Sequence, residues 1–177
     1  AGYGGLGGVS GGNTNPAYGD FRNPNDTGSG GGSFSGHRAG NGGGLVRIAA
    51  QTIALDGSIR ANGGAANGAG AGGSGGGIRI DVVTLSGAGS ISANGSAASS
   101  SGGGGGGGGR VAVYYQNATA FNFGNVTAFG ATFGGSSVNG GAGTVYLRGP
   151  GRESGELILD NNNLIAPTET TPVFAVP

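Results

Sequence analysis

The single histidine, His37, is the side chain best suited to proton transfer near neutral pH. It stands in the glycine-rich stretch Ser35-Gly-His-Arg, and the chain has no cysteine and no lysine. A Ser-His-Asp or Cys-His site needs a histidine held rigidly beside its nucleophile. We therefore expect His37 to be a solvent-facing loop residue, with no catalytic residues and no enzyme activity in this chain.

The eight acidic residues are scattered, and pairs that lie close in sequence include Asp20 with Asp26 and Glu153 with Glu156. Paired carboxylates can serve glycoside hydrolysis or calcium binding. The first pair encloses two asparagines and could wrap Ca²⁺ with oxygen ligands, but Asx turns and strand caps account for the same residues. We expect no metal site and no cofactor, and keep Asp20 and Asp26 as a weak calcium candidate.

The sequence offers two ways in which the protein could carry or bind sugars. Asn-X-Ser/Thr sequons would carry glycans in a secreted protein of a glycosylating organism, although a chain rich in Asn, Ser and Thr also contains such triplets by chance. The candidates are Asn25, Asn94, Asn117 and Asn125. Aromatic side chains could stack on a bound sugar, but we expect most of them to be core or cover for the last repeats. They are Tyr114, Phe121, Phe123, Phe129 and Phe133.

Arg47 and Arg79 stand at equivalent positions of two similar segments. On adjacent strands their like charges would repel. They therefore need a nearby acid such as Asp56 or Asp81, backbone carbonyl groups, or an anionic polymer on that face. We expect Arg47 and Arg79 to stack in a solvated row and to donate hydrogen bonds to carbonyl groups of the glycine loops. The alternative is that the two arginines form a binding site for an anionic glycan.

Charged residues make up 9% of the chain, with eight cations against eight acids. No basic stripe exists that would neutralise phosphates or anionic lipids, so nucleic acid is a poor partner. No apolar run approaches the ~20 residues of a membrane span, so we expect no membrane insertion. The absence of cysteine and methionine removes oxidisable sulfur, which suits an extracellular or cell-surface location.

From Gly44 onward the sequence repeats. Apolar runs begin at Val46, Ile78, Val111 and Val145, with spacings of 32 to 34 residues that indicate a repeat array. Each unit alternates apolar and polar residues like a strand, and no segment has helical periodicity. We expect three short strands per unit, with inward residues in the first unit at Val46, Ile48, Ile53, Leu55 and Ile59.

This pattern predicts an all-β fold with essentially no helix, a parallel β-helix or solenoid of about four coils. A β-sandwich is the alternative. We treat the chain as one domain with an N-terminal segment covering the solenoid, four repeats and an extended tail. The bounds are 1–44 for the segment, 45–77, 78–110, 111–143 and 144–163 for the repeats, and 164–177 for the tail.

Forty-eight of 177 residues are glycine, and eight of them are consecutive at 102–109. Ordering glycine costs roughly 0.5–1 kcal/mol per residue relative to alanine, so the tracts need compensating contacts. Connections that end one repeat apart, at Gly44, Gly77 and Gly109, could stack as extended polyglycine-II-like segments. Residues 3–9 could also adopt this polyglycine-II-like conformation. We instead expect them to form a loose coil that lies on the surface of the folded repeats.

Several motifs carry a resemblance to a known class of protein. They are GSGGG at 28–32, LDGSIRANGG at 55–64, the octaglycine before RVAVYY, and GGAGTVYL at 140–147 followed by GELILDNN. Together they resemble the glycine-rich β-helix-like regions of large secreted or surface bacterial proteins. The resemblance implies a repeat module and no established catalytic residues.

An open-ended solenoid exposes strand edges that another chain can join. The tail between the last two prolines is extended and apolar enough to add to a neighbour as a strand, through Val173, Phe174, Ala175 and Val176. Such head-to-tail contacts make filaments. We expect a structural, self-associating extracellular protein with itself as partner, or a surface or adhesive stalk. The alternative is a carbohydrate-binding module, with a polysaccharide lyase less favoured.

Overall fold

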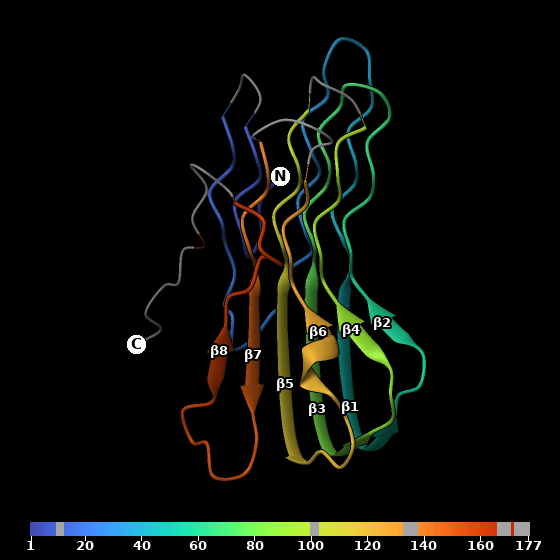
Figure 1. Cartoon of the computed structure of the whole chain (residues 1–177), viewed down its shortest axis with the longest axis vertical. Helices are drawn as coiled ribbons and strands as arrows, with labels where there is room; N and C mark the ends of the chain where they lie inside the picture. The colour runs from blue at the N-terminus through green and yellow to red at the C-terminus, as the bar shows by residue number, and fades with distance from the viewer. Residues whose placement is uncertain (10–12, 100–102, 133–137, 166–170, 172–177) are drawn as a thin grey trace.

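The computed structural model describes residues 1–9, 13–99, 103–132, 138–165 and 171. Within them the chain is all-β, and its one helical element is a 3-10 turn, η1, at Phe123–Asn125. Figure 1 shows the strands gathered in one half of the molecule, while the other half consists of extended segments that lead into them. We call this second half the glycine layer.

The larger sheet has five strands in the order β1-β3-β5-β7-β8. Its first four strands are parallel, and their register aligns Val46 with Ile78, Ile78 with Val111, and Val111 with Val145. The repeat alignment expected from the sequence is therefore confirmed. The strands are β1 (Leu45–Ala54), β3 (Gly77–Ser86), β5 (Arg110–Asn117), β7 (Thr144–Arg148) and β8 (Glu156–Ile158).

A second, three-stranded parallel sheet has the order β2-β4-β6. Its strands are short: β2 is Ser58–Arg60, β4 is Ser90–Ser92 and β6 is Val126–Thr127. Each of the first three repeats therefore contributes one long strand to the larger sheet and one short strand to the smaller sheet. The expected three strands per repeat are wrong, because residues 45–54 form one continuous strand.

The fourth repeat also departs from the expected coil. After β7 the chain turns back, and β8 pairs with β7 in the antiparallel direction, with Tyr146 opposite Leu157. A hairpin needs a short connection only, whereas a further parallel strand needs a long crossover. Over the described residues the strands form two separate sheets that do not close into a solenoid.

The apolar core lies between the two sheets, where the alternating residues of each strand face inward. Ile78, Ile80, Leu85 and Ile91 of the second repeat are fully buried. Their counterparts in the first repeat are only half-buried, because no strand among the described residues lies beyond β1 and β2. The buried core residues are Ala61, Ile78, Ile80, Val82, Leu85, Ile91, Ala93, Val111, Val113, Phe121, Val126, Ala128, Val145 and Leu147.

Asparagines join the repeats where the smaller sheet ends. The Asn62 side-chain oxygen accepts the backbone N–H of Asn94, and the Asn94 side-chain oxygen accepts the N–H of Phe129, both at 2.8 Å. Asn161 accepts the N–H of Gly130 at the same distance. Ala-Asn-Gly occurs at residues 61–63 and again at 93–95. The side-chain bonds of its asparagine, which satisfy backbone donors of the next repeat, explain this recurrence.

In the glycine layer, the described part of the octaglycine is surrounded by other segments. The N–H groups of Gly105 and Gly108 donate to carbonyl oxygens in segment 138–141, and those of Gly106 and Gly109 donate to segment 93–96. Hydrogen-bond partners thus recur every three residues, which is the period of a polyproline-II-type helix. Backbone groups that glycine leaves unshielded are satisfied by neighbouring segments.

The N-terminal residues form part of this layer. The N–H groups of Gly5 and Gly8 donate to Gly108 and Gly105, both at 2.8 Å, and the N–H of Gly107 donates to Ala1 at 3.0 Å. The segment therefore runs antiparallel to the octaglycine and is largely buried. The loose surface coil that we preferred for residues 3–9 is wrong, because these residues complete the hydrogen bonding of the central tract.

Candidate functional site

The outward-facing side chains of the larger sheet form rows across its parallel strands. One row follows the register Ala49, Asp81, Tyr114 and Arg148, contributed in turn by β1, β3, β5 and β7. The row beside it begins with Arg47 and Arg79. Because the repeats stay in register, polar and aromatic groups far apart in sequence lie side by side on this face.

A loop from the N-terminal segment, residues 17–27, covers part of this outer face. The Tyr114 hydroxyl donates to the carbonyl oxygen of Arg22 at 2.6 Å. The Phe21 ring lies edge-on to Tyr146, with 5.5 Å between ring centroids, and is buried with Ala112. Elsewhere on the face, Ala49, Gln51, Gln116 and Arg148 are exposed.

The two stacked arginines find partners in this loop and in the sheet. Arg79 binds both carboxylate oxygens of Asp81, at 2.8 and 2.9 Å, and donates to the side-chain oxygen of Asn23 at 2.7 Å. Arg47 donates to the side-chain oxygen of Asn25 at 2.6 Å. Hydrogen bonding to Asp81 raises the pKa of Arg79. Asp81 is confirmed as a partner, whereas the expected bonds to glycine-loop carbonyl groups are wrong.

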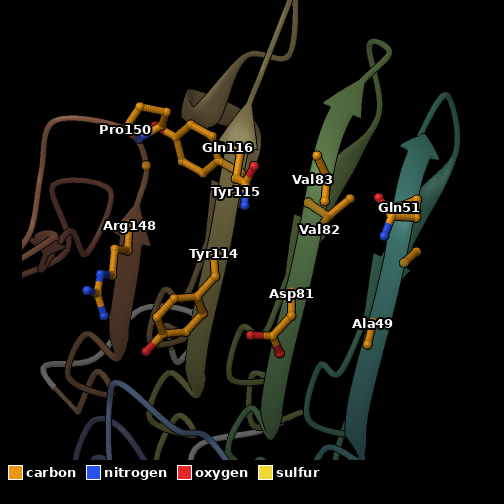
Figure 2. Close-up of a pocket in the computed structure, with 12 residues that line it drawn as sticks. Ala49, Gln51, Asp81, Val82, Val83, Tyr114, Tyr115, Gln116, Arg148 and Pro150 are labelled. Carbon is orange, nitrogen blue, oxygen red and sulfur yellow. The ribbon is translucent and has the colours of Figure 1, made fainter.

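Beyond the loop, an open groove of about 1010 Å³ crosses β1, β3, β5 and β7. Figure 2 shows its side chains on four neighbouring strands, with Tyr114 and Arg148 on adjacent ones. Gln51, Gln116 and Arg148 line this groove and make no side-chain hydrogen bond or ion pair within the described residues. We call this feature the outer groove. It offers unused amides and one unpaired guanidinium beside an aromatic ring.

The weak calcium candidate uses its oxygens within the protein. An Asp20 carboxylate oxygen accepts the backbone N–H of Arg22 at 2.8 Å, which is an Asx turn, and the two asparagines hold the arginines described above. In the described part of the chain, Asp20 and Asp26 belong to no cluster of three or more acidic or histidine side chains that could hold a metal ion.

The four sequon asparagines differ in their surroundings. Asn94 belongs to the asparagine ladder, Asn125 donates its side-chain amide to Gly89 at 3.2 Å, and Asn25 holds Arg47. Asn117 is exposed at the end of β5, and its oxygen accepts the Thr119 hydroxyl at 2.8 Å. Asn25 and Asn117 are therefore the two sequon asparagines that are exposed and whose amide nitrogens make no hydrogen bond within the described residues.

The remaining candidate residues lie in different structural environments. His37 is exposed in a turn where its backbone bonds to Phe34. Phe121 is buried in the core and Phe123 contacts Tyr115 at a centroid distance of 4.8 Å, so neither forms a sugar platform. Phe133 lies outside the described residues, as do the tail candidates Val173, Phe174, Ala175 and Val176.

Sequence reasoning missed a buried pair beneath the loop, Arg110 and Tyr3. Arg110 is 1% exposed, donates from Nε to the Tyr18 carbonyl oxygen at 2.9 Å, and places its guanidinium carbon 5.6 Å from the Tyr3 ring centroid. The equivalent positions in the first two repeats are Leu45 and Gly77. The repeat pattern contained no signal for this burial, because the covering residues come from the N-terminal segment.

This pair predicts a loss of stability at high pH. Burial raises the pKa of Tyr3 from 10.0 to about 12, and the backbone of Asp26 and, to a smaller extent, the positive charge of Arg110 oppose the rise in part. Above pH 10 the unfolded chain binds fewer protons than the folded one, so the free energy of unfolding falls until the pH passes the folded pKa. We expect a loss of roughly 2–3 kcal/mol between pH 10 and 12.

Urea unfolding at a series of pH values measures this loss, and Tyr3→Phe serves as the comparison. The variant should lose less stability over the same interval, with a residual slope because burial also raises the pKa of Tyr18 and Tyr114. Identical slopes in both proteins would contradict the assignment.

No family model matches the chain, and no curated protein or solved structure is significantly similar to it. The described residues contain no helix long and apolar enough to cross a membrane.

Proposed function

We propose that this chain is a structural, extracellular, self-associating module and no enzyme. We further propose that its two sheets are an open form of a parallel β-solenoid, stabilised by a polyglycine-II-like layer. The observation that carries the proposal is the outer edge of β1, a ten-residue strand that pairs only with β3 among the described residues.

Natural proteins usually protect such an edge with short strands, charges or proline. β1 is long, contains no proline and carries Arg47 as its one charge. Beside this edge, the inward residues Val46, Ile53 and Ile59 are half-buried although they pack on the core. An added strand would pair the edge and complete the burial of these residues.

The opposite end of the sheet is built differently. β8 has three residues, and the neighbouring Arg152 forms an ion pair with Glu156 at its start. Near this end the Thr171 hydroxyl donates to the carbonyl oxygen of Ala142, just before β7. Thr171 therefore lies near the end of the larger sheet opposite β1.

A donor segment at one end and an acceptor edge at the other define a heterologous contact. Such contacts do not close on themselves and generate filaments. The proposed occupant of the β1 edge is the tail of a second copy, with Val173, Phe174, Ala175 and Val176 as the added strand.

Electron microscopy and sedimentation of the full chain at high concentration test this proposal. We expect filaments from the wild type and monomers after deletion of residues 172–177. Ile48→Lys should also give monomers, because it places a charge beside the acceptor edge at a half-buried position where the side chain can reach water.

Thermal unfolding checks that both variants remain folded. A wild-type chain that stays a monodisperse monomer would overturn the proposal. A dimer that survives the tail deletion would show β1-to-β1 pairing instead of tail addition.

A further inference from the structure

We propose that the outer groove binds a linear polysaccharide that carries carboxylate groups. This inference goes beyond self-association, because the proposed assembly uses the sheet edge and the tail, whereas the outer groove lies on a sheet face. It rests on three observations: a guanidinium without an acidic partner, two side-chain amides without hydrogen-bond partners among the described residues, and rows of outward-facing side chains that cross the parallel strands.

The charge of the groove points to an acidic ligand. Asp81 is neutralised by its two bonds to Arg79, so the carboxylate is already paired. Arg148 is exposed and pairs with no acid within the described residues. Its planar guanidinium can bind a carboxylate through two parallel hydrogen bonds, which a neutral sugar cannot exploit.

The other lining groups suit sugar hydroxyls. Gln51 and Gln116 each offer an amide that is both donor and acceptor, and neither amide is used within the described residues. Figure 2 shows Val83 on the strand between those of Gln51 and Gln116, and Tyr114 adds further apolar surface on the same strand as Gln116. A pyranose ring has both kinds of surface, with apolar C–H faces and a polar rim.

The dimensions favour a polymer over a single sugar. Parallel strands lie about 4.8 Å apart, so a row across β1, β3, β5 and β7 extends for roughly 14 Å. The strand spacing is close to the length of one pyranose unit in an extended chain. The groove volume of about 1010 Å³ also exceeds what one sugar fills.

Other polymers fit less well. Nucleic acid binding relies on several cations that neutralise phosphates, and this groove has one unpaired guanidinium. A peptide that adds as a strand needs an open edge, whereas β3 and β5 are paired on both sides. The polysaccharide is therefore the occupant that the groove chemistry favours.

Calorimetric titration of the full chain with uronate oligosaccharides tests the proposal. The panel contains oligomers of galacturonate, glucuronate, mannuronate and guluronate, together with a neutral gluco-oligosaccharide. We expect binding of at least one uronate oligomer, weaker binding at high salt, and weaker binding of the neutral one.

Arg148→Gln should lower the uronate affinity roughly tenfold to a hundredfold, as expected for a lost hydrogen bond to a charged group. Arg152→Gln is the matched control, because Arg152 is also exposed but lies outside the groove and should leave affinity unchanged. Gln116→Ala should weaken the uronate and neutral oligomers alike.

The proposal is overturned if no uronate oligomer binds, if Arg148→Gln binds as tightly as the wild type, or if Arg152→Gln weakens binding as much as Arg148→Gln does. A tail-deleted chain that forms no filaments but still binds the uronate oligomer would show that self-association and polysaccharide binding use different surfaces. Binding without any filament formation would sink the assembly proposal alone.

Discussion

Replacing Gly107 by valine should lower the free energy of unfolding by about 3 kcal/mol or more, at the upper end of the cost of overpacking. A Cβ atom at this position would overlap the backbone carbonyl oxygen of Gly5. Backbone atoms cannot rotate away as a flexible side chain can. The neighbouring segment would have to separate, which would break its hydrogen bonds to Gly105 and Gly108.

Chemical unfolding measures this loss, and Gly32→Val provides the control within the same layer. No atom lies within 4 Å of the Cβ that would be built at Gly32. The control should therefore change stability by less than about 1 kcal/mol, whereas Gly107→Val should lower Tm by roughly 10 °C. Equal Tm values for the two variants would show that the octaglycine is a loop and not a packed segment.

Tyr3→Ala should have an effect of similar size, a loss of about 3–5 kcal/mol, as for other large aromatic truncations. Tyr3 is fully buried, with its ring 4.9 Å from the ring of Tyr18 and beside the guanidinium of Arg110. Truncation would leave a cavity next to a buried charge. One guanidinium nitrogen of Arg110 already has no hydrogen-bond partner among the described residues.

Tyr3→Phe separates the ring from the hydroxyl. The Tyr3 hydroxyl has no well-aligned hydrogen-bond partner among the described residues, so its removal should change stability at neutral pH by less than about 1 kcal/mol. Urea unfolding of Tyr3→Ala and Tyr3→Phe measures the two predicted changes in the free energy of unfolding. A large loss in Tyr3→Phe would show that the hydroxyl has a partner that stabilises the fold, and a small loss in Tyr3→Ala would place the ring outside the core.

The strands of the first three repeats could be predicted because each repeat contains its own signal. Alternation at Ile78, Ile80 and Val82 predicts a half-buried strand in any context, and the constant spacing predicts the register of that strand with Val46 and Val111. The last repeat breaks this rule because a short connection after Arg148 allows an antiparallel return.

The side-chain contacts on the outer face of the larger sheet could be predicted only in part. Equivalent positions predict that Arg47 and Arg79 lie side by side, and Asp81 follows from its place two residues along the same strand face. The loop that covers part of this face comes from residues 17–27, and Asn23 gives no local signal for its contact with Arg79, which lies 56 positions away in sequence. A loop without periodic apolar residues carries no local signal for its docking site.

The amino-acid sequence by itself determined the all-β class, the repeat register and the side chains that face the core, because strand alternation and repeat spacing are local properties. Only the tertiary structure decided how the glycine segments surround one another, where the N-terminal segment inserts and why Arg110 is buried. Glycine tracts have no side-chain pattern to distinguish one neighbour from another. Their arrangement depends on backbone hydrogen bonds between distant segments, such as Gly5 with Gly108, which form only when the whole chain has folded.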